Sequence, residues 1–389
     1  LAQYDARRAV ESYQQAQVAA RESCDRRLGS VSRGSLAIAY FRLGDPGRAR
    51  DLQEQALAIA RETGDRKLEA LQLGNLATLY RHLGDLSGAA DLHEQALAIA
   101  RETESRPLEA NQLGNLGTAY RLLGRVGLAI EHHEKALAVA RELEDLQMEG
   151  QSLGSLGNCY LAQGSHKQAT EYYLEAWQIA KKVGDRESEA NWLGGVGNAR
   201  FAPVRDWQFR PPWWRQIPRL FRLSTTVRTA MWYYKRAARI AGEIGDRKAE
   251  GVWQGNIGTA YHRLGRMREA IPYYERALDL ARETGDRTNE AGWLRSLGNA
   301  YGGLKEPQRA MAYYEQALAL EGDAPESAQK CILLYNMGLR AEQAGDVERA
   351  REIWTRALGS CGLESLGLAS KISCKLSALS DESQPDHSE

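Results

Sequence analysis

The chain has 389 residues, and its 51 basic residues balance its 51 acidic residues, so its formal net charge is zero. A neutral chain has no overall attraction to nucleic acid or to an anionic membrane, which argues against partners of either class. The apolar runs are all far shorter than a membrane-spanning helix requires. A protein partner remains compatible with this composition.

Five cysteines stand at positions 24, 159, 331, 361 and 374, without a CxxC pair and without a His/Cys cluster at metal-ligand spacing. Their odd number and irregular spacing favour reduced thiols in a cytoplasmic protein, with no metal and no cofactor. The preference for arginine over lysine, together with many alanines, leucines and glycines, favours a bacterial source.

A tyrosine recurs at a fixed spacing of 40 residues, at positions 40, 80, 120 and 160 and again at 261 and 301. The gap of 101 residues between positions 160 and 261 exceeds two periods by 21. Two alanines seven residues apart, such as Ala129 and Ala136, keep the same period, and seven residues is two turns of a helix. Each unit therefore holds two helices, and because one pair cannot bury its apolar face alone, the pairs are predicted to stack into an α-solenoid.

In chain order, residues 4–24 match the second helix of a unit, so the array opens with half a unit. Eight units follow, starting near residues 28, 68, 108, 148, 188, 249, 289 and 326. In the third unit we expect helices over residues 108–123 and 126–142. Turns of the type "GDR", as at residues 64–66, supply a glycine for positive φ and an aspartate that caps the next helix.

The repeat pattern covers residues 1–362 and then fails. Residues 363–379 predict a capping helix with Leu366, Ile372, Leu376 and Leu379 as its apolar positions, and residues 380–389 predict a disordered acidic tail. Because Leu1 already lies inside a unit, we expect that further sequence precedes it, such as an effector domain in the same chain.

These marks resemble the tetratricopeptide repeat: a large apolar residue, then Leu-Gly and Tyr in the first helix, and two alanines in the second. The third unit supplies Leu113, Leu116, Gly117 and Tyr120. The resemblance implies a right-handed superhelical platform for protein binding. The 40-residue unit with its "LGN" and "GDR" segments looks like the subgroup found in LGN/Pins-type adaptors and in the repeat arrays of bacterial signalling proteins of the STAND/NB-ARC and caspase-like kinds.

The first helix of each unit carries short amides and hydroxyls on the face opposite its apolar stripe. The resemblance places these helices on the concave wall, where a row of amides could hold an extended peptide backbone through both donors and acceptors. Arginines beside the row would favour an acidic segment. The alternative is a set of ordinary solvated positions. The candidate residues are Asn75, Arg81, Asn111, Asn115, Arg121, Asn158, Asn191, Asn198, Asn256, Arg263 and Asn299.

The 21 added residues, about 203–223, lie between the two helices of the fifth unit. We expect the first of these helices to end near Phe201 and the second to begin near Ser224. Four prolines prevent one long helix there. Tryptophan and arginine are enriched at binding hot spots, which favours a second contact with the partner. Alternatively the segment folds back onto its own repeats, or contacts a membrane or nucleic acid. The candidate residues are Trp207, Trp213, Trp214 and Arg215.

Three further features have a structural interpretation. Trp192, Trp253 and Trp293 share one position in successive units, which favours packing between repeats over an exposed patch. His132 and His133 are adjacent and point in different directions on a helix, which argues against a metal pair. The recurring "ARE" segments predict modest ion pairs within one helix.

The sequence contains no GxxxxGK[ST], HExxH or GxSxG motif. It therefore predicts a non-enzymatic scaffold that binds a protein or an extended peptide, as the sensor or adaptor part of a larger signalling protein. The alternative is a regulator whose groove senses a small molecule or a short signal peptide.

Overall fold

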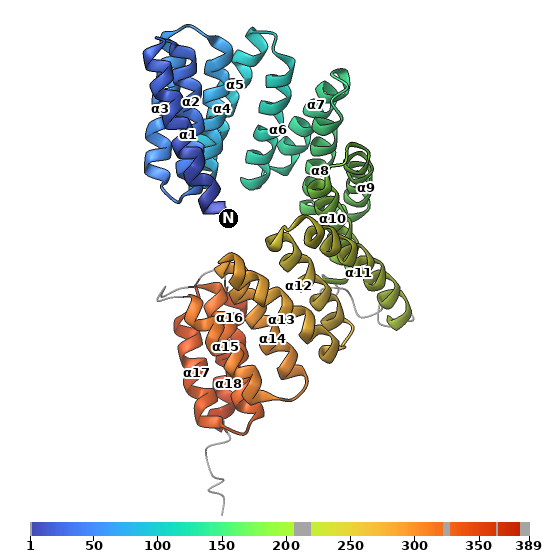
Figure 1. Cartoon of the computed structure of the whole chain (residues 1–389). Helices are drawn as coiled ribbons and strands as arrows, with labels where there is room; N and C mark the ends of the chain where they lie inside the picture. Colours follow the sequence, from blue (N-terminus) through green and yellow to red (C-terminus); the bar gives the residue numbers. More distant parts are fainter. Residues whose placement is uncertain (1, 206–218, 322–326, 363–364, 382–389) are drawn as a thin grey trace, which may run out of the picture. The chain divides into compact units, whose positions relative to one another are not determined.

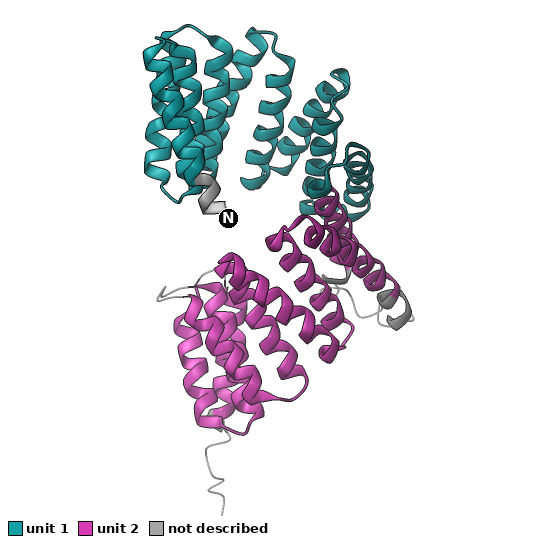
Figure 2. Cartoon of the chain, in the orientation of Figure 1, with its two compact units in different colours: residues 1–188 teal, residues 189–389 magenta. Residues whose placement is uncertain are grey.

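The computed structural model describes residues 2–205, 219–321, 327–362 and 365–381, and the regular structure in these ranges is helical (Figure 1). By its internal contacts the chain divides into two compact units, residues 1–188 and 189–389 (Figure 2). Within each unit, helices that follow one another in the chain pack together, and helices two apart make smaller contacts. This is the packing of an α-solenoid, which confirms the predicted fold class.

The first unit contains α1 (Ala2–Glu22), α2 (Arg26–Arg42), α3 (Pro46–Glu62), α4 (Arg66–Leu83), α5 (Leu86–Glu102), α6 (Arg106–Leu122), α7 (Val126–Glu142), α8 (Leu146–Ala162) and α9 (His166–Val183). Helix α10 (Arg186–Arg205) starts at the end of this unit and continues into the second. The second unit then contains α11 (Arg219–Ile244), α12 (Arg247–Arg263), α13 (Met267–Thr284), α14 (Arg287–Gly303), α15 (Pro307–Glu321), α16 (Ala328–Gln343), α17 (Val347–Gly359) and α18 (Leu366–Asp381).

The turns between helices have the chemistry that their sequence predicts. Gly64 takes a φ of +65°, and the carboxylate of Asp65 accepts a hydrogen bond of 3.0 Å from the backbone N–H of Leu68. Asp246 caps α12 in the same way through the N–H of Ala249, at 2.9 Å. These caps satisfy backbone donors that the first turn of a helix would otherwise leave unpaired.

The paired alanines form the tightest part of the core. Ala129 and Ala136 on α7 are 0% and 1% exposed, and Ala136 belongs to the same buried cluster as Leu113 and Leu116 of α6. The other alanines of this pattern are at most 1% exposed. Small side chains at these positions let neighbouring helices approach closely, so the prediction that they line the contact between helices is confirmed.

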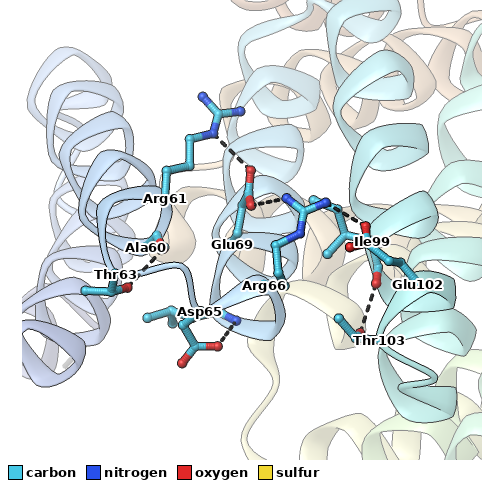
Figure 3. A network of polar contacts seen from close by, with 10 residues as sticks. Ala60, Arg61, Thr63, Asp65, Arg66, Glu69, Ile99, Glu102 and Thr103 are labelled. Carbon is cyan, nitrogen blue, oxygen red and sulfur yellow. Dashed lines mark hydrogen bonds and ion pairs between the residues drawn. The ribbon is translucent and has the colours of Figure 1, made fainter.

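Ion pairs connect helices both within a repeat and between successive repeats of the first unit. The guanidinium of Arg66 at the start of α4 donates to the carboxylate of Glu69 and, at 2.7 Å, to that of Glu102 at the end of α5 (Figure 3). Arg61 at the end of α3 donates to the same Glu69 at 3.0 Å. Forty residues later, Arg101 and Arg106 donate to the carboxylate of Glu109 in the same way. Local pairs within one helix are present as predicted, for example between Arg66 and Glu69. The stacking of the helices adds pairs between positions 8 and 36 residues apart, which the sequence pattern did not indicate.

The helices beside the insertion are longer than predicted. Helix α10 continues through Pro203 to Arg205, and α11 begins at Arg219, so Ser224 lies inside a helix and is not its cap. A proline in the last turn removes only one backbone hydrogen bond, and the arginines and leucines of 219–223 are good helix formers.

The end of the array differs from the prediction in two details. In α18, Ile372 and Leu379 are buried against the core that contains Trp354, but Leu366 at its first turn is 65% exposed. Cys331 and Cys361 are joined in a disulfide, so the expectation of reduced thiols was wrong for this pair, which the stacking of α16 and α17 brings together. The predicted tail lies outside the described residues beyond position 381.

Candidate functional site

In the second unit, amides of the first helices accept hydrogen bonds from tyrosines of the second helices. Oδ1 of Asn198 on α10 accepts from the hydroxyl of Tyr234 at 2.9 Å and from Nδ2 of Asn256 on α12 at 3.5 Å. Oδ1 of Asn299 on α14 accepts from the hydroxyl of Tyr314 at 2.7 Å. All three asparagines are half-buried. The acceptor oxygens of Asn198 and Asn299 are already bound within the array.

In the first unit the candidate amides have different surroundings. Asn158 on α8 accepts from the hydroxyl of Tyr173 at 2.7 Å, like its counterparts in the second unit. Asn75 on α4 is half-buried, whereas Asn111 and Asn115 on α6 are exposed. In the second unit, Asn191 on α10 is also exposed.

Asn111 and Asn115 lie together at a cavity of about 120 Å³ between α6 and α8. Its volume exceeds the roughly 10–15 Å³ that one water molecule needs. The α8 wall includes Gln151, Ser152 and Ser155, and the exposed side chains of Asn111, Asn115 and Gln151 connect the cavity to solvent. The cavity is thus a polar depression within the row of candidate residues.

His133 on α7 forms the buried part of this cavity. Its side chain is 1% exposed, and neither ring nitrogen has a hydrogen-bond partner. Burial, with smaller effects of Arg121 and His132, lowers the pKa of His133 to about 4, so the imidazole is neutral at neutral pH. A neutral imidazole presents one donor and one acceptor.

The neighbouring histidine has a separate role. The ring of His132 stacks on that of Tyr120, with 5.4 Å between centroids and 22° between planes. The two histidines therefore face different surroundings. Over the residues that the structure describes, no group of three or more His, Cys, Asp or Glu side chains could hold a metal ion.

The candidate arginines are not equivalent. Arg81 is half-buried, with its guanidinium 3.1 Å from Nε2 of His82, and Arg263 is exposed. Arg121 is half-buried on α6, and its positive charge acts on the titration of His133. Of the three, Arg121 is the one whose charge reaches the cavity.

The tryptophan positions serve packing between repeats, as predicted. Trp253 is 8% exposed and stacks on Tyr234, and Trp293 stacks on Tyr274, each with 6.2 Å between ring centroids. The indole of Trp253 occupies the space beside Gly194, where a Cβ atom would lie 2.1 Å from the ring.

The candidate residues of the insertion, Trp207, Trp213, Trp214 and Arg215, lie outside the described residues. In the described ranges, no helix combines the length and the apolar character needed to span a membrane.

His133 was not predicted as a cavity residue, because its place in the repeat pattern and its neighbour His132 do not indicate a cavity. A signal was present elsewhere in the repeat. The position 19 residues after His133 holds Ser152, whereas the corresponding positions hold the larger Gln72, Gln112 and Trp253. Comparing this position across units would have shown where side-chain volume is missing.

Comparison with family models gives matches along much of the chain. Three models described as tetratricopeptide repeat match residues 31–63, residues 152–187, and residues 68–142, 233–283 and 249–320. A search of curated protein sequences found no match.

Three solved structures illustrate the similarity in fold. A STAND protein with a tetratricopeptide repeat sensor from Pyrococcus horikoshii is 14% identical, with a TM-score of 0.63 over 90% of this chain and 52% of its own. The apo form of RapI is 13% identical, with a TM-score of 0.56 over 75% of this chain and 97% of its own. A Rap protein complexed with competence and sporulation factor is 13% identical, with a TM-score of 0.53 over 91% and 98%. At these identities the likeness concerns the fold.

Proposed function

Because the chain belongs to the tetratricopeptide repeat family, we propose that it is a non-enzymatic scaffold that binds an extended peptide segment of a protein partner. The observation that carries the proposal is the pair of exposed amides on α6, Asn111 and Asn115, beside a polar cavity between two first helices. Amides offer both donors and acceptors, so they can bind the backbone of a segment whatever its side chains.

Charge favours an acidic segment. Arg121 on α6 and Arg81 on α4 lie beside the amide row, one repeat apart. Positive charge at the rim of a site raises the association rate of an acidic partner. In the second unit, the acceptors of Asn198 and Asn299 are bound by tyrosines, which leaves N–H groups that suit backbone carbonyls. The scaffold thus offers mainly donors in that unit and complete amides around the cavity.

The setting that we propose is a cytoplasmic bacterial signalling protein in which this array is the sensor or adaptor part, joined to an effector domain. The fold resembles that of a STAND protein with a tetratricopeptide repeat sensor and that of a Rap protein complexed with competence and sporulation factor. The insertion of about residues 203–223 would then supply a second contact through its tryptophans and arginines.

A second candidate function is supported by the cavity itself. A bounded polar cavity with a buried imidazole suits a small molecule or a short signal peptide, so the chain would act as a ligand-sensing regulator. Binding of a small molecule should change the packing of α6 on α8, whereas an extended peptide should also contact neighbouring repeats.

The test is selection of peptides from a random display library on the immobilised full chain. The scaffold proposal predicts a family of mutually competing peptides enriched in acidic residues. The affinity of each selected peptide is then measured for the native chain and for a variant in which residues 203–223 are replaced by "AQGSHK", the turn of the fourth unit. Weaker binding would assign the insertion a contact role, and unchanged binding would restrict the site to the amides. Failure to enrich any peptide would contradict the scaffold proposal.

A further inference from the structure

One position of the first helix in each repeat packs against the second helix of the preceding repeat. At the first such junction, Nε2 of Gln53 donates to Oε1 of Gln72 at 2.7 Å. At the next, Nδ1–H of His93 donates to Oε1 of Gln112 at 2.8 Å, and both side chains are buried. In the second unit the same position holds a tryptophan stacked on a tyrosine, as with Trp253. A large side chain therefore fills this place at each of these junctions.

The junction between α7 and α8 departs from this rule, because Ser152 stands where Gln112 stands forty residues earlier. A Cβ atom on Gly74 would lie 2.7 Å from the amide nitrogen of Gln112, but one on Gly114 would meet nothing within 4 Å. The cavity of about 120 Å³ opens at this place. At the equivalent place between α12 and α14, Trp293 occupies the space, and a Cβ atom on Gly255, the counterpart of Gly114, would lie 2.1 Å from its ring.

The same substitution leaves His133 without the partner that His93 has. Both histidines are 1% exposed, but only His93 has a hydrogen bond to a carboxamide. The hydroxyl of Thr118, the nearby alternative, donates instead to the carbonyl of Gly114 at 3.1 Å. Buried imidazoles without hydrogen bonds are rare, because burial removes their bonds to water. His133 is thus an unsatisfied buried group at the inner end of a polar cavity.

We propose that this cavity binds a carboxamide, the side-chain group of glutamine or asparagine, supplied by the ligand in place of the missing Gln112 equivalent. The carbonyl oxygen accepts from an imidazole N–H of His133, as Gln112 does from His93. The carboxamide NH₂ donates to the hydroxyl or amide oxygens of the wall, such as those of Ser155 and Asn115. The inference rests on the proposed peptide-binding function, and it adds the side chain that the scaffold selects.

Two observations favour a carboxamide over a carboxylate of the same shape. The neutral imidazole and the amides of the wall offer donors and acceptors together, and a carboxamide uses both, whereas a carboxylate only accepts. The protein itself places a carboxamide on the equivalent histidine one repeat earlier. Arg121 is the nearby charge that would favour a carboxylate, so propionate is the decisive comparison ligand.

The experiment uses the full chain labelled with ¹³C in its seven histidines, observed by NMR. The signal of His133 is the one lost in His133→Phe, which keeps an aromatic ring without nitrogen atoms. Propionamide, which equals the glutamine side chain, is titrated against propionate. We expect saturable shifts of the His133 signal with propionamide in the millimolar range, and at least tenfold weaker saturation with propionate. Absence of a saturable shift, or equal saturation by both ligands, would overturn the proposal.

Ser152→Gln is the matched variant, since it rebuilds the pair that Gln112 forms with His93 and fills the cavity without disturbing the helix. We expect the His133 signal in this variant to move to a new position and to respond to neither ligand. A response to propionamide as strong as in the native chain would overturn the assignment of the site.

Two peptides distinguish the sources of the carboxamide: acetyl-Ala-Ala-Gln-Ala-Ala-amide and the same sequence with Glu. If the Gln peptide saturates the His133 signal at a lower concentration than propionamide does, the natural ligand is a peptide side chain. If both saturate it at the same concentration, the natural ligand is a small amide. Both results support the proposed pocket. If library-selected peptides bind but leave His133 unaffected, the pocket assignment fails while the scaffold function stands.

Discussion

Gln112→Ser should convert the junction between α5 and α6 into a copy of the junction between α7 and α8. In the native chain, Gln112 is 4% exposed and its Oε1 lies 2.8 Å from Nδ1 of His93, which is 1% exposed. The substitution removes the carboxamide and one methylene group. His93 then becomes a buried imidazole without a partner, as His133 is now.

The size of the effect follows from these two losses. Removing a buried methylene costs about 0.8 kcal/mol. Leaving the buried His93 donor unsatisfied costs about 1–3 kcal/mol. The local free energy of opening should therefore fall by about 2–4 kcal/mol, which corresponds to roughly a 30- to 1000-fold loss of protection against hydrogen exchange.

Hydrogen exchange measured by mass spectrometry is the suitable assay, because repeat arrays open locally and a single global transition would hide the effect. The loss should be confined to peptides from α5 and α6, with α12 and α13 unchanged. Gln151→Ser, at an exposed position of α8, is the matched control and should change protection by less than about threefold. A loss below threefold for Gln112→Ser, or one spread evenly over the chain, would refute the reasoning.

Three further predictions concern other contacts. The pKa of His133 is about 4 in the folded chain and about 6.5 in the unfolded chain, so its contribution to stability is complete above pH 6.5 and decreases by about 3 kcal/mol toward pH 4. The free energy of unfolding, measured in urea as a function of pH, should show this decrease. In His133→Phe, the free energy of unfolding should vary less over the same pH range. Glu109→Gln removes the charge that pairs with Arg101 and Arg106, so it should destabilise the α5–α6 junction by about 1 kcal/mol, as measured by hydrogen exchange. Because salt screens ion pairs, an effect that stays the same in high salt would contradict an ionic origin. Gly258→Ala should lower the free energy of unfolding, measured in urea, by about 1–3 kcal/mol, because the new Cβ would lie 2.8 Å from the ring of Tyr274. Gly292→Ala is the control, since its Cβ would have no neighbour within 4 Å, and it should be neutral or stabilising. Equal effects of the two substitutions would contradict the packing argument.

The fold was predictable because each unit repeats the same local solution. A glycine and an aspartate mark each turn, and alanines such as Ala129 and Ala136 mark where helices meet, so helix order and the boundaries of α7 followed from the period alone. Prediction was weaker beside the insertion, where the periodic pattern stops and prolines suggested earlier helix ends than Arg205.

The site was only partly predictable, because its properties depend on contacts between units. The period indicates that Asn115 and Asn158 occupy related faces, but it does not indicate that Tyr173 binds Asn158 while Asn115 remains exposed. Likewise, Ser152 is an ordinary helix residue until the stacking of α8 on α7 places it opposite His133. Such differences among similar units arise from side-chain length across a junction, which hydrophobic periodicity does not describe.

The most direct test of the scaffold proposal is the affinity of a library-selected peptide, measured by calorimetry, for the native chain and for the double variant Asn111→Ala and Asn115→Ala. The control is Glu134→Ala with Lys135→Ala, two exposed residues of α7 outside the amide row. The proposal predicts at least a tenfold loss of affinity, about 1.4 kcal/mol, for the amide variant and less than a twofold change for the control. Equal affinity of the native chain and the amide variant would contradict it.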